Sequence, residues 1–192
     1  MSMNLRKLAV VTGTSQAIGL ELARLCARSN YDLVIADDGL SLLDAAQDLA
    51  TSGVVVCPVR CDLSTPQGVD ALRQAIAASG RPADILIANA VGAGGAPHGR
   101  QVIDDAHACI DETIYMVDQV SRSMRGLGRG RILINLQAVY DASNAFVDYF
   151  SVALNRALKH CGVTVTCLVA PMQSPGAPVL QAFNRISPDC VA

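Results

Sequence analysis

Aromatic residues are scarce in this chain of 192 residues, which has no Trp, three Phe and four Tyr. Apolar residues nevertheless make up 51% of the sequence, so the core has to consist mainly of Val, Ile, Leu and Ala. That composition is typical of a buried parallel sheet covered by Ala-rich helices. The length fits one domain, and we expect residues 1–192 to form a single one.

Neither sign of charge is in excess, since the formal net charge is −2 and the sequence pI is about 5.8. This balance gives no indication of a nucleic acid or an anionic membrane as a partner. No apolar run is long enough to span a membrane, and residues 1–7 contain no apolar signal core. We therefore expect a cytoplasmic protein with no nucleic-acid or membrane partner.

The seven cysteines form no C-x-x-C pair and no cluster with histidine at the spacing of zinc ligands. We expect no metal site, and we interpret the cysteines as buried thiols in a reducing compartment. Lysine is rarer still, because Lys7 and Lys159 are the only two.

Short apolar runs alternate with amphipathic segments of helical length. The runs predict buried strands at Leu8–Val11, Leu33–Ala36, Val54–Val59, Ile85–Ile87, Ile132–Leu136 and Val163–Val169. The segments between them predict helices at Ile18–Ser29, Leu40–Ser52, Pro66–Ser79, about 103–125 and about 142–160. Six such repeats predict an α/β fold, a Rossmann-like doubly wound parallel sheet of about six strands flanked by helices.

Residues 173–192 are expected to form a short tail. Four prolines lie at or near this tail: Pro171, Pro175, Pro178 and Pro188. Proline interrupts helices and central strands, so the tail is expected to hold neither a further long helix nor a central strand.

The first predicted strand runs into a glycine-containing turn, residues 12–19 (TGTSQAIG), that opens a helix. Free N–H groups and the positive end of a helix dipole at such a turn can bind a pyrophosphate. Gly13 permits the tight turn, and Gly19 allows the helix to pack close to the strand. At the first strand–helix turn of a six-fold repeat, this spacing indicates a nucleotide site.

The turn resembles the TGxxxGxG loop of the short-chain dehydrogenase/reductase family. Three more features follow in the order of that family: Asp37 ends the second strand, Asp62-Leu63 follows the third, and Ala88-Asn89-Ala90 follows the fourth. The resemblance covers residues 7 to about 172. It implies a cofactor site made of Gly13, Ser15, Gln16, Ile18, Gly19, Asp37, Asp62, Leu63, Asn89 and Ala90.

The family uses a nicotinamide dinucleotide. Asp37 is followed by Asp38 and not by Arg, which favours NAD over NADP. Two positions depart from the family pattern, since Ala17 replaces the middle glycine of the loop and Val91 replaces the glycine of the NNAG motif.

The residues at the catalytic positions depart further from the family pattern. Family members use a Ser, a Tyr acid/base and a Lys four residues after the Tyr, and that Lys lowers the Tyr pKa. Tyr140 reproduces the YxASK spelling with Asn144 in place of Lys, whereas a second alignment uses Tyr149. In both alignments the Ser position falls on Ala138, or on Gln137 if shifted by one.

Two functions remain open from the sequence. One is an NAD(H)-linked oxidoreductase that acts on a small carbonyl or alcohol substrate through a degenerate site. The other is an inactive nucleotide-binding or protein-interaction module. By analogy with the family, a homodimer through the fourth and fifth helices is expected.

Overall fold

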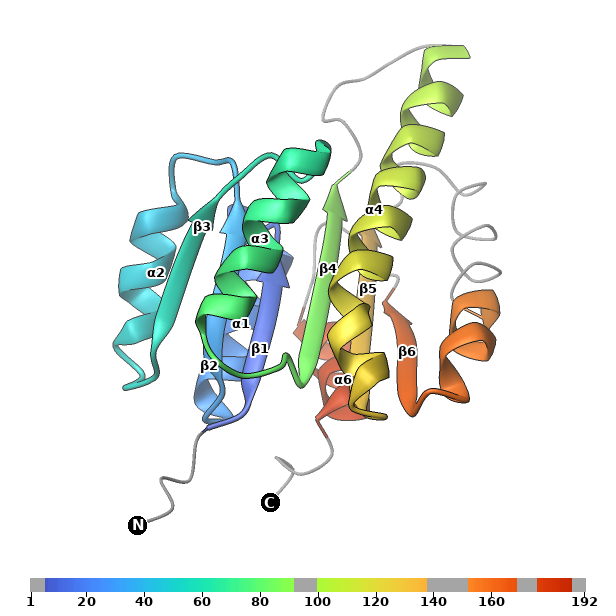
Figure 1. Ribbon diagram of the computed structural model, residues 1–192. Helices are drawn as coiled ribbons and strands as arrows, with labels where there is room; N and C mark the ends of the chain where they lie inside the picture. Colours follow the sequence, from blue (N-terminus) through green and yellow to red (C-terminus); the bar gives the residue numbers. More distant parts are fainter. Residues whose placement is uncertain (1–5, 92–99, 138–151, 169–175, 188–192) are drawn as a thin grey trace.

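The computed structural model describes residues 6–91, 100–137, 152–168 and 176–187 (Figure 1). Six strands in these ranges form one sheet in the order β3-β2-β1-β4-β5-β6, and every neighbouring pair is parallel. The strands are β1 (Leu8–Thr12), β2 (Asp32–Asp37), β3 (Val56–Arg60), β4 (Ile85–Val91), β5 (Gly130–Gln137) and β6 (Val163–Leu168). This arrangement confirms the predicted Rossmann-like α/β fold.

Helices cover both faces of the sheet (Figure 1). They are α1 (Ala17–Arg28), α2 (Leu42–Ala50), α3 (Pro66–Ala78), α4 (Arg100–Gly126) and α6 (Gly176–Ile186), and residues 152–159 are also helical. One buried apolar cluster joins α1, α2 and α6 to one face of the sheet. A second cluster joins α3, α4 and the helical residues 152–159 to the other face.

Local signals in the sequence explain where several helices begin and end. The Thr65 hydroxyl accepts a hydrogen bond from the Gly68 N–H at 3.1 Å, and Pro66 occupies the first helical position of α3. After α2 the chain turns at Gly53, whose φ of 77° favours glycine.

The prediction of a buried strand at Val54–Val59 is wrong in its burial. Among the described strands β2 alone flanks β3, and the residues of β3 are half-buried or exposed. An edge strand tolerates Pro58, because one row of its N–H groups faces away from the sheet. Of the described cysteines, Cys26 is buried as expected, whereas Cys57 is exposed and Cys61, Cys161 and Cys167 are intermediate.

The expectation that the tail holds no further long helix is also wrong. Residues 176–186 form the three-turn helix α6, whose Val179 and Phe183 are buried against the sheet and α1. Pro178 lies in the first turn, where the backbone N–H has no partner within the helix. Proline at this position therefore does not interrupt the helix.

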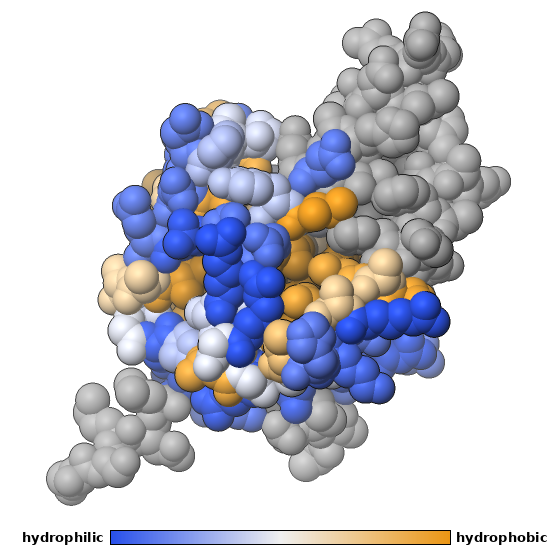
Figure 2. Space-filling view, turned by 45° about the vertical axis from the view of Figure 1, so that its right-hand side comes forward, coloured by the Kyte–Doolittle hydropathy of each residue, from blue (hydrophilic) through white to orange (hydrophobic). Residues whose placement is uncertain are grey.

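A groove of about 780 Å³ separates α3 and α4. Ile76 and Val120 are buried along it, and Leu127 is half exposed. Figure 2 shows apolar side chains exposed between bands of hydrophilic ones. Among the described residues, no helix combines the length and the apolarity that a membrane span requires.

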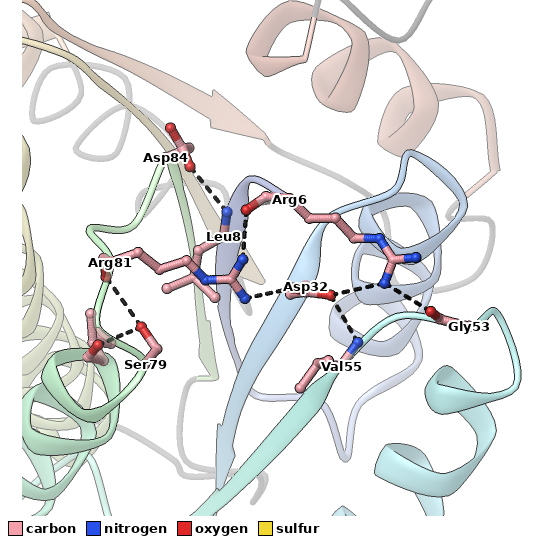
Figure 3. Close-up of polar contacts among 9 residues, drawn as sticks. Arg6, Leu8, Asp32, Gly53, Val55, Ser79, Arg81 and Asp84 are labelled. Atoms are coloured by element: carbon pink, nitrogen blue, oxygen red, sulfur yellow. Dashed lines mark hydrogen bonds and ion pairs between the residues drawn. The ribbon is translucent and has the colours of Figure 1, made fainter. Parts of the chain in front are cut away.

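An ion network ties together the amino ends of the strands (Figure 3). Asp32, which is 6% exposed, accepts hydrogen bonds from Arg81 at 2.6 Å and from the Val55 N–H at 2.8 Å. Arg81 also donates to the Arg6 carbonyl at 2.6 Å, and Arg6 lies 3.5 Å from the Asp32 carboxylate. The network therefore joins the starts of β1 and β2 to the segments that lead into β3 and β4.

This network makes stability depend on pH. Burial alone would raise the pKa of Asp32, but the bonds from Arg81 and Val55 and the charges of Arg81 and Arg6 lower it. A carboxyl with a lowered pKa stabilises the fold above its unfolded pKa of about 3.9, and this stabilisation is lost as pH falls through the folded value. We therefore expect Asp32→Asn to destabilise the protein at neutral pH and much less in acid.

Urea unfolding of the wild type and of Asp32→Asn measures this difference. The gap between the two free energies of unfolding should shrink as the pH is lowered below the unfolded pKa of about 3.9 and through the folded one. A gap that stays constant over this range would show that the Asp32 charge does not contribute to stability.

Candidate functional site

A cavity of about 290 Å³ lies where the carboxyl ends of β1, β2, β3 and β4 meet. It is lined by the loops that follow the first three of these strands, by Asn89 of β4, and by Thr113 and Met116 of α4. The order of the strands reverses between β1 and β4, and open α/β sheets bind their ligands at such a switch point.

The loop after β1 is packed too tightly for side chains at two positions. Gly13 has a φ of 67°, and a Cβ there would lie 2.8 Å from the Asn89 carbonyl oxygen. A Cβ on Gly19 would overlap the Gly13 carbonyl. The two glycines thus bring the start of α1 directly against the end of β1, as the sequence predicts.

The first turn of α1 remains open to an anion. Gln16, the residue before the helix, makes no side-chain capping bond, and no acidic residue lies in the first turn. Its N–H groups and the positive end of the helix dipole therefore remain available. Ala17 is exposed at this turn, where its methyl group narrows the approach to the backbone.

Asp37 holds this loop against the end of β2. Its two carboxylate oxygens accept hydrogen bonds from the Ser15 N–H and the Gly39 N–H, both at 2.8 Å. The residue is 6% exposed and still lines the cavity. Each oxygen keeps a second lone pair, so Asp37 is able to accept further bonds from a hydroxyl of a ligand.

The cavity wall is strongly acidic. Asp37, Asp38 and Asp62 all line it, and the described part of its lining contains no Lys, Arg or His. The hydroxyl and the N–H of Ser64 lower the pKa of Asp62, which is therefore ionised at neutral pH. Burial and these three carboxylates raise the pKa of the Cys61 thiol to about 11, so the wall disfavours a further negative charge.

Asn89 connects the loop to the centre of the sheet. Its side-chain Nδ2 donates to the Gly13 carbonyl at 3.1 Å, and its N–H donates to the Thr12 hydroxyl at 3.0 Å. Thr113 and Met116 of α4 close the other side of the cavity, and neither is among the residues predicted from the sequence. Their spacing of three residues on one helical stripe with Val117 and Val120 is the signal that identifies them.

The structure brings together seven of the predicted cofactor residues. Gly13, Ser15, Gln16, Asp37, Asp62, Leu63 and Asn89 line the cavity. Gly19 supports the loop from within, and Ile18 is buried in the core. The Ala90 side chain lies outside what the structure describes.

The predicted catalytic positions Ala138, Tyr140, Asn144 and Tyr149 lie within 138–151, outside the described residues. Neither lysine is near the cavity. Lys7 lines a hollow at the opposite, amino edge of the sheet, and Lys159 is exposed at the end of the helical residues 152–159. Within the described ranges no group of three or more His, Cys, Asp or Glu side chains could hold a metal ion.

Comparison with known proteins gives a consistent family. The family model described as short chain dehydrogenase matches residues 7–177. An uncharacterized oxidoreductase of Myxococcus xanthus is 29% identical over 176 residues, which cover 83% of this chain and 69% of that protein. The 1-deoxy-11-beta-hydroxypentalenate dehydrogenase of Streptomyces avermitilis is 33% identical, but its aligned part is only 57% of its length.

Solved structures agree with the family match. The L-sorbose reductase of Gluconobacter frateurii, complexed with NADPH and L-sorbose, has a TM-score of 0.75 at 27% identity, covering 85% of this chain and 68% of that chain. Actinorhodin polyketide ketoreductase with NADPH has a TM-score of 0.74 at 26% identity, covering 85% and 69%. Together with the strand order and the glycine loop, these matches show that the chain belongs to the short-chain dehydrogenase family.

Proposed function

We propose that this chain binds NAD(H) in the cavity at the carboxyl edge of the sheet and acts as an oxidoreductase on a small carbonyl or alcohol. The observation that carries this proposal is the convergence of the open α1 turn, the buried Asp37 and the Asp62-Leu63 segment on one cavity. The first would receive the pyrophosphate, the second the adenosine ribose and the third the adenine.

The described residues fit such a cofactor. Gly13 and Gly19 bring the uncapped first turn of α1 against the end of β1, where a pyrophosphate would approach, and Asp37 offers lone pairs for the ribose hydroxyls. The methyl group of Ala17 opposes this fit in part, so the affinity should lie below that of a loop with glycine at this position.

The charges of the cavity favour NAD over NADP. The 2′-phosphate of NADP would add about two negative charges close to Asp37 and Asp38, and among the described residues no cation lines the cavity to offset them. The same carboxylates already oppose ionisation of the Cys61 thiol. The two solved relatives hold NADPH, so the preference for NAD rests on the residues of this chain alone.

Calorimetric titration with NADH and with NADPH tests this proposal. We expect micromolar binding of NADH and at least about tenfold weaker binding of NADPH, which corresponds to ~1.4 kcal/mol. Equal affinities would contradict the proposed cofactor preference. If neither dinucleotide binds, the proposed function is wrong.

The proposed chemistry depends on a tyrosine without a lysine. When bound, the nicotinamide would supply or accept the hydride, and the hydroxyl of Tyr140 or Tyr149 would give or take the proton. An unperturbed Tyr has a pKa of about 10, and Asn144 in place of Lys adds no charge to lower it. We therefore infer a slow reaction.

Three variants separate the slow enzyme from the alternative, an inactive nucleotide-binding or interaction module. Asn144→Lys should raise the rate of carbonyl reduction if Tyr140 is the acid. Loss of activity in Tyr149→Phe but not in Tyr140→Phe would support the other alignment. A protein that binds NADH but shows no turnover in any variant would favour the inactive module.

We also propose a homodimer through α4 and the helical residues 152–159. Tyr115 on α4 and Val152 are 41% and 51% exposed, which provides apolar surface on both elements. Sedimentation velocity that shows a monomer at all concentrations would exclude it.

A further inference from the structure

Two buried asparagine side chains meet at the carboxyl end of the sheet. Asn135 of β5 is 0% exposed, and the register of the strands places it beside Asn89 of β4. The Asn135 Nδ2 donates a hydrogen bond to the Asn89 Oδ1. Asn89 lines the cavity and Asn135 does not, so Asn135 acts on the site only through Asn89.

The direction of both amides follows from the chemistry of their neighbours. A backbone carbonyl only accepts hydrogen bonds, so the Asn89 group that faces the Gly13 carbonyl has to be its Nδ2. The Asn89 Oδ1 then faces Asn135, which has to present its own Nδ2. A single chain of donors therefore runs from β5 through β4 to the loop after β1.

Gly13 is in contact with Asn89 on two sides. Its carbonyl accepts the Asn89 side chain, and its Cα lies so close to the Asn89 backbone that a Cβ would be 2.8 Å from the carbonyl oxygen. Gly13 in turn supports Gly19 at the start of α1. A change in the orientation of the Asn89 side chain would therefore move the part of the loop proposed to bind the pyrophosphate.

Stability does not explain an asparagine at position 135. Its Oδ1 is buried and has no hydrogen-bond partner among the described residues, and such an acceptor destabilises the fold. Leucine, which has the same branched shape but a larger volume, would remove this oxygen but leave the Asn89 Oδ1 without its donor. The number of unpartnered buried oxygens would stay the same, so the change in hydrogen bonding should alter the free energy of unfolding little, and only the larger volume should lower it.

We propose that Asn135 is a positioning residue for the nucleotide loop, which it holds in its binding conformation through Asn89 and Gly13. This inference rests on the proposed nucleotide site. We expect Asn135 to affect binding of the pyrophosphate but not of the adenosine. Asp37 and Asp62, which are proposed to bind the adenosine, reach the cavity from the ends of β2 and β3 and make no contact with Asn135 among the contacts described.

The test compares Asn135→Leu with Ile134→Val, a matched control at an equally buried neighbouring position. The ligands are NADH, ADP-ribose and adenosine, the last of which has no phosphate. In Asn135→Leu we expect about tenfold weaker binding of NADH and ADP-ribose, and adenosine binding within about twofold of the wild type. Ile134→Val should change none of the three.

Amide hydrogen exchange without ligand gives a second measurement. Exchange at the Gly13 and Ser15 amides, which donate to the Ala36 carbonyl and to Asp37, should be faster in Asn135→Leu than in the control. If Asn135→Leu does not fold, Asn135→Ser makes the same comparison with a smaller side chain.

Each outcome decides the proposal. Unchanged ADP-ribose affinity, or an equal loss for ADP-ribose and adenosine, would overturn it. If the wild type binds none of the ligands, the proposed function is wrong, and the positioning role of Asn135 is then tested by hydrogen exchange alone. Faster exchange at the Gly13 and Ser15 amides of Asn135→Leu would support this role, and unchanged exchange would overturn it.

Discussion

Replacing Gly19 by Ala is expected to cost about 3 kcal/mol of unfolding free energy, at the upper end of the usual penalty for overpacking. The added Cβ would overlap the carbonyl oxygen of Gly13 and lie 2.8 Å from its carbonyl carbon. Both atoms belong to the backbone, so no side chain can rotate to relieve the overlap. The start of α1 has to move away from β1, and NADH binding should be lost with it.

Gly126→Ala is the matched control. Gly126 is also a helical glycine, at the end of α4, but a Cβ there would meet nothing within 4 Å. Alanine is favoured over glycine in helices, so this variant should be neutral or up to about 1 kcal/mol more stable. Urea unfolding measures both variants. If Gly19→Ala is as stable as Gly126→Ala, the close contact between α1 and β1 is wrong.

Asp37→Asn is expected to weaken NADH binding by about ten- to a hundredfold, the range for losing one charge-assisted hydrogen bond. The reason is geometric, because both Asp37 oxygens accept from backbone N–H groups. An Asn amide has one oxygen, so its NH₂ group would face the N–H of either Ser15 or Gly39. One edge of the loop should therefore detach, and an acceptor for the ribose is lost as well.

Asp70→Ala serves as the control for Asp37→Asn. Asp70 is an exposed acid on α3 that pairs with Arg73 and does not line the cavity. Calorimetry should give an NADH dissociation constant within about twofold of the wild type, as expected for an exposed ion pair. An Asp37→Asn protein that keeps wild-type affinity would show that Asp37 neither shapes the loop nor contacts the cofactor.

The sequence predicts the positions of helices and strands better than it predicts their neighbours and their burial. Apolar runs locate all six strands, yet periodicity alone does not show that β3 lies at an edge, because this depends on the order of strands in space. The number of prolines in the tail does not exclude the helix α6, because Pro178 occupies its first turn, where proline is tolerated.

Some residues of the candidate site can also be predicted from the sequence, whereas others cannot. Gly13, Asp37 and Asp62 lie at or just after strand ends, so a linear pattern identifies them. The pairing of Asn135 with Asn89 joins residues 46 positions apart and depends on strand register. Thr113 reaches the cavity because α4 packs against β4, which depends on the arrangement of elements in space.

The central proposal is that the dinucleotide binds in the acidic cavity, and an amide chemical-shift map of the isotope-labelled protein titrated with NADH tests it directly. The largest shifts are expected at Gly13, Ser15, Gly39 and Asp62, which surround this cavity. Shifts that concentrate instead at the opposite edge, around Lys7 and Arg131, or no saturable shift at all, would contradict it.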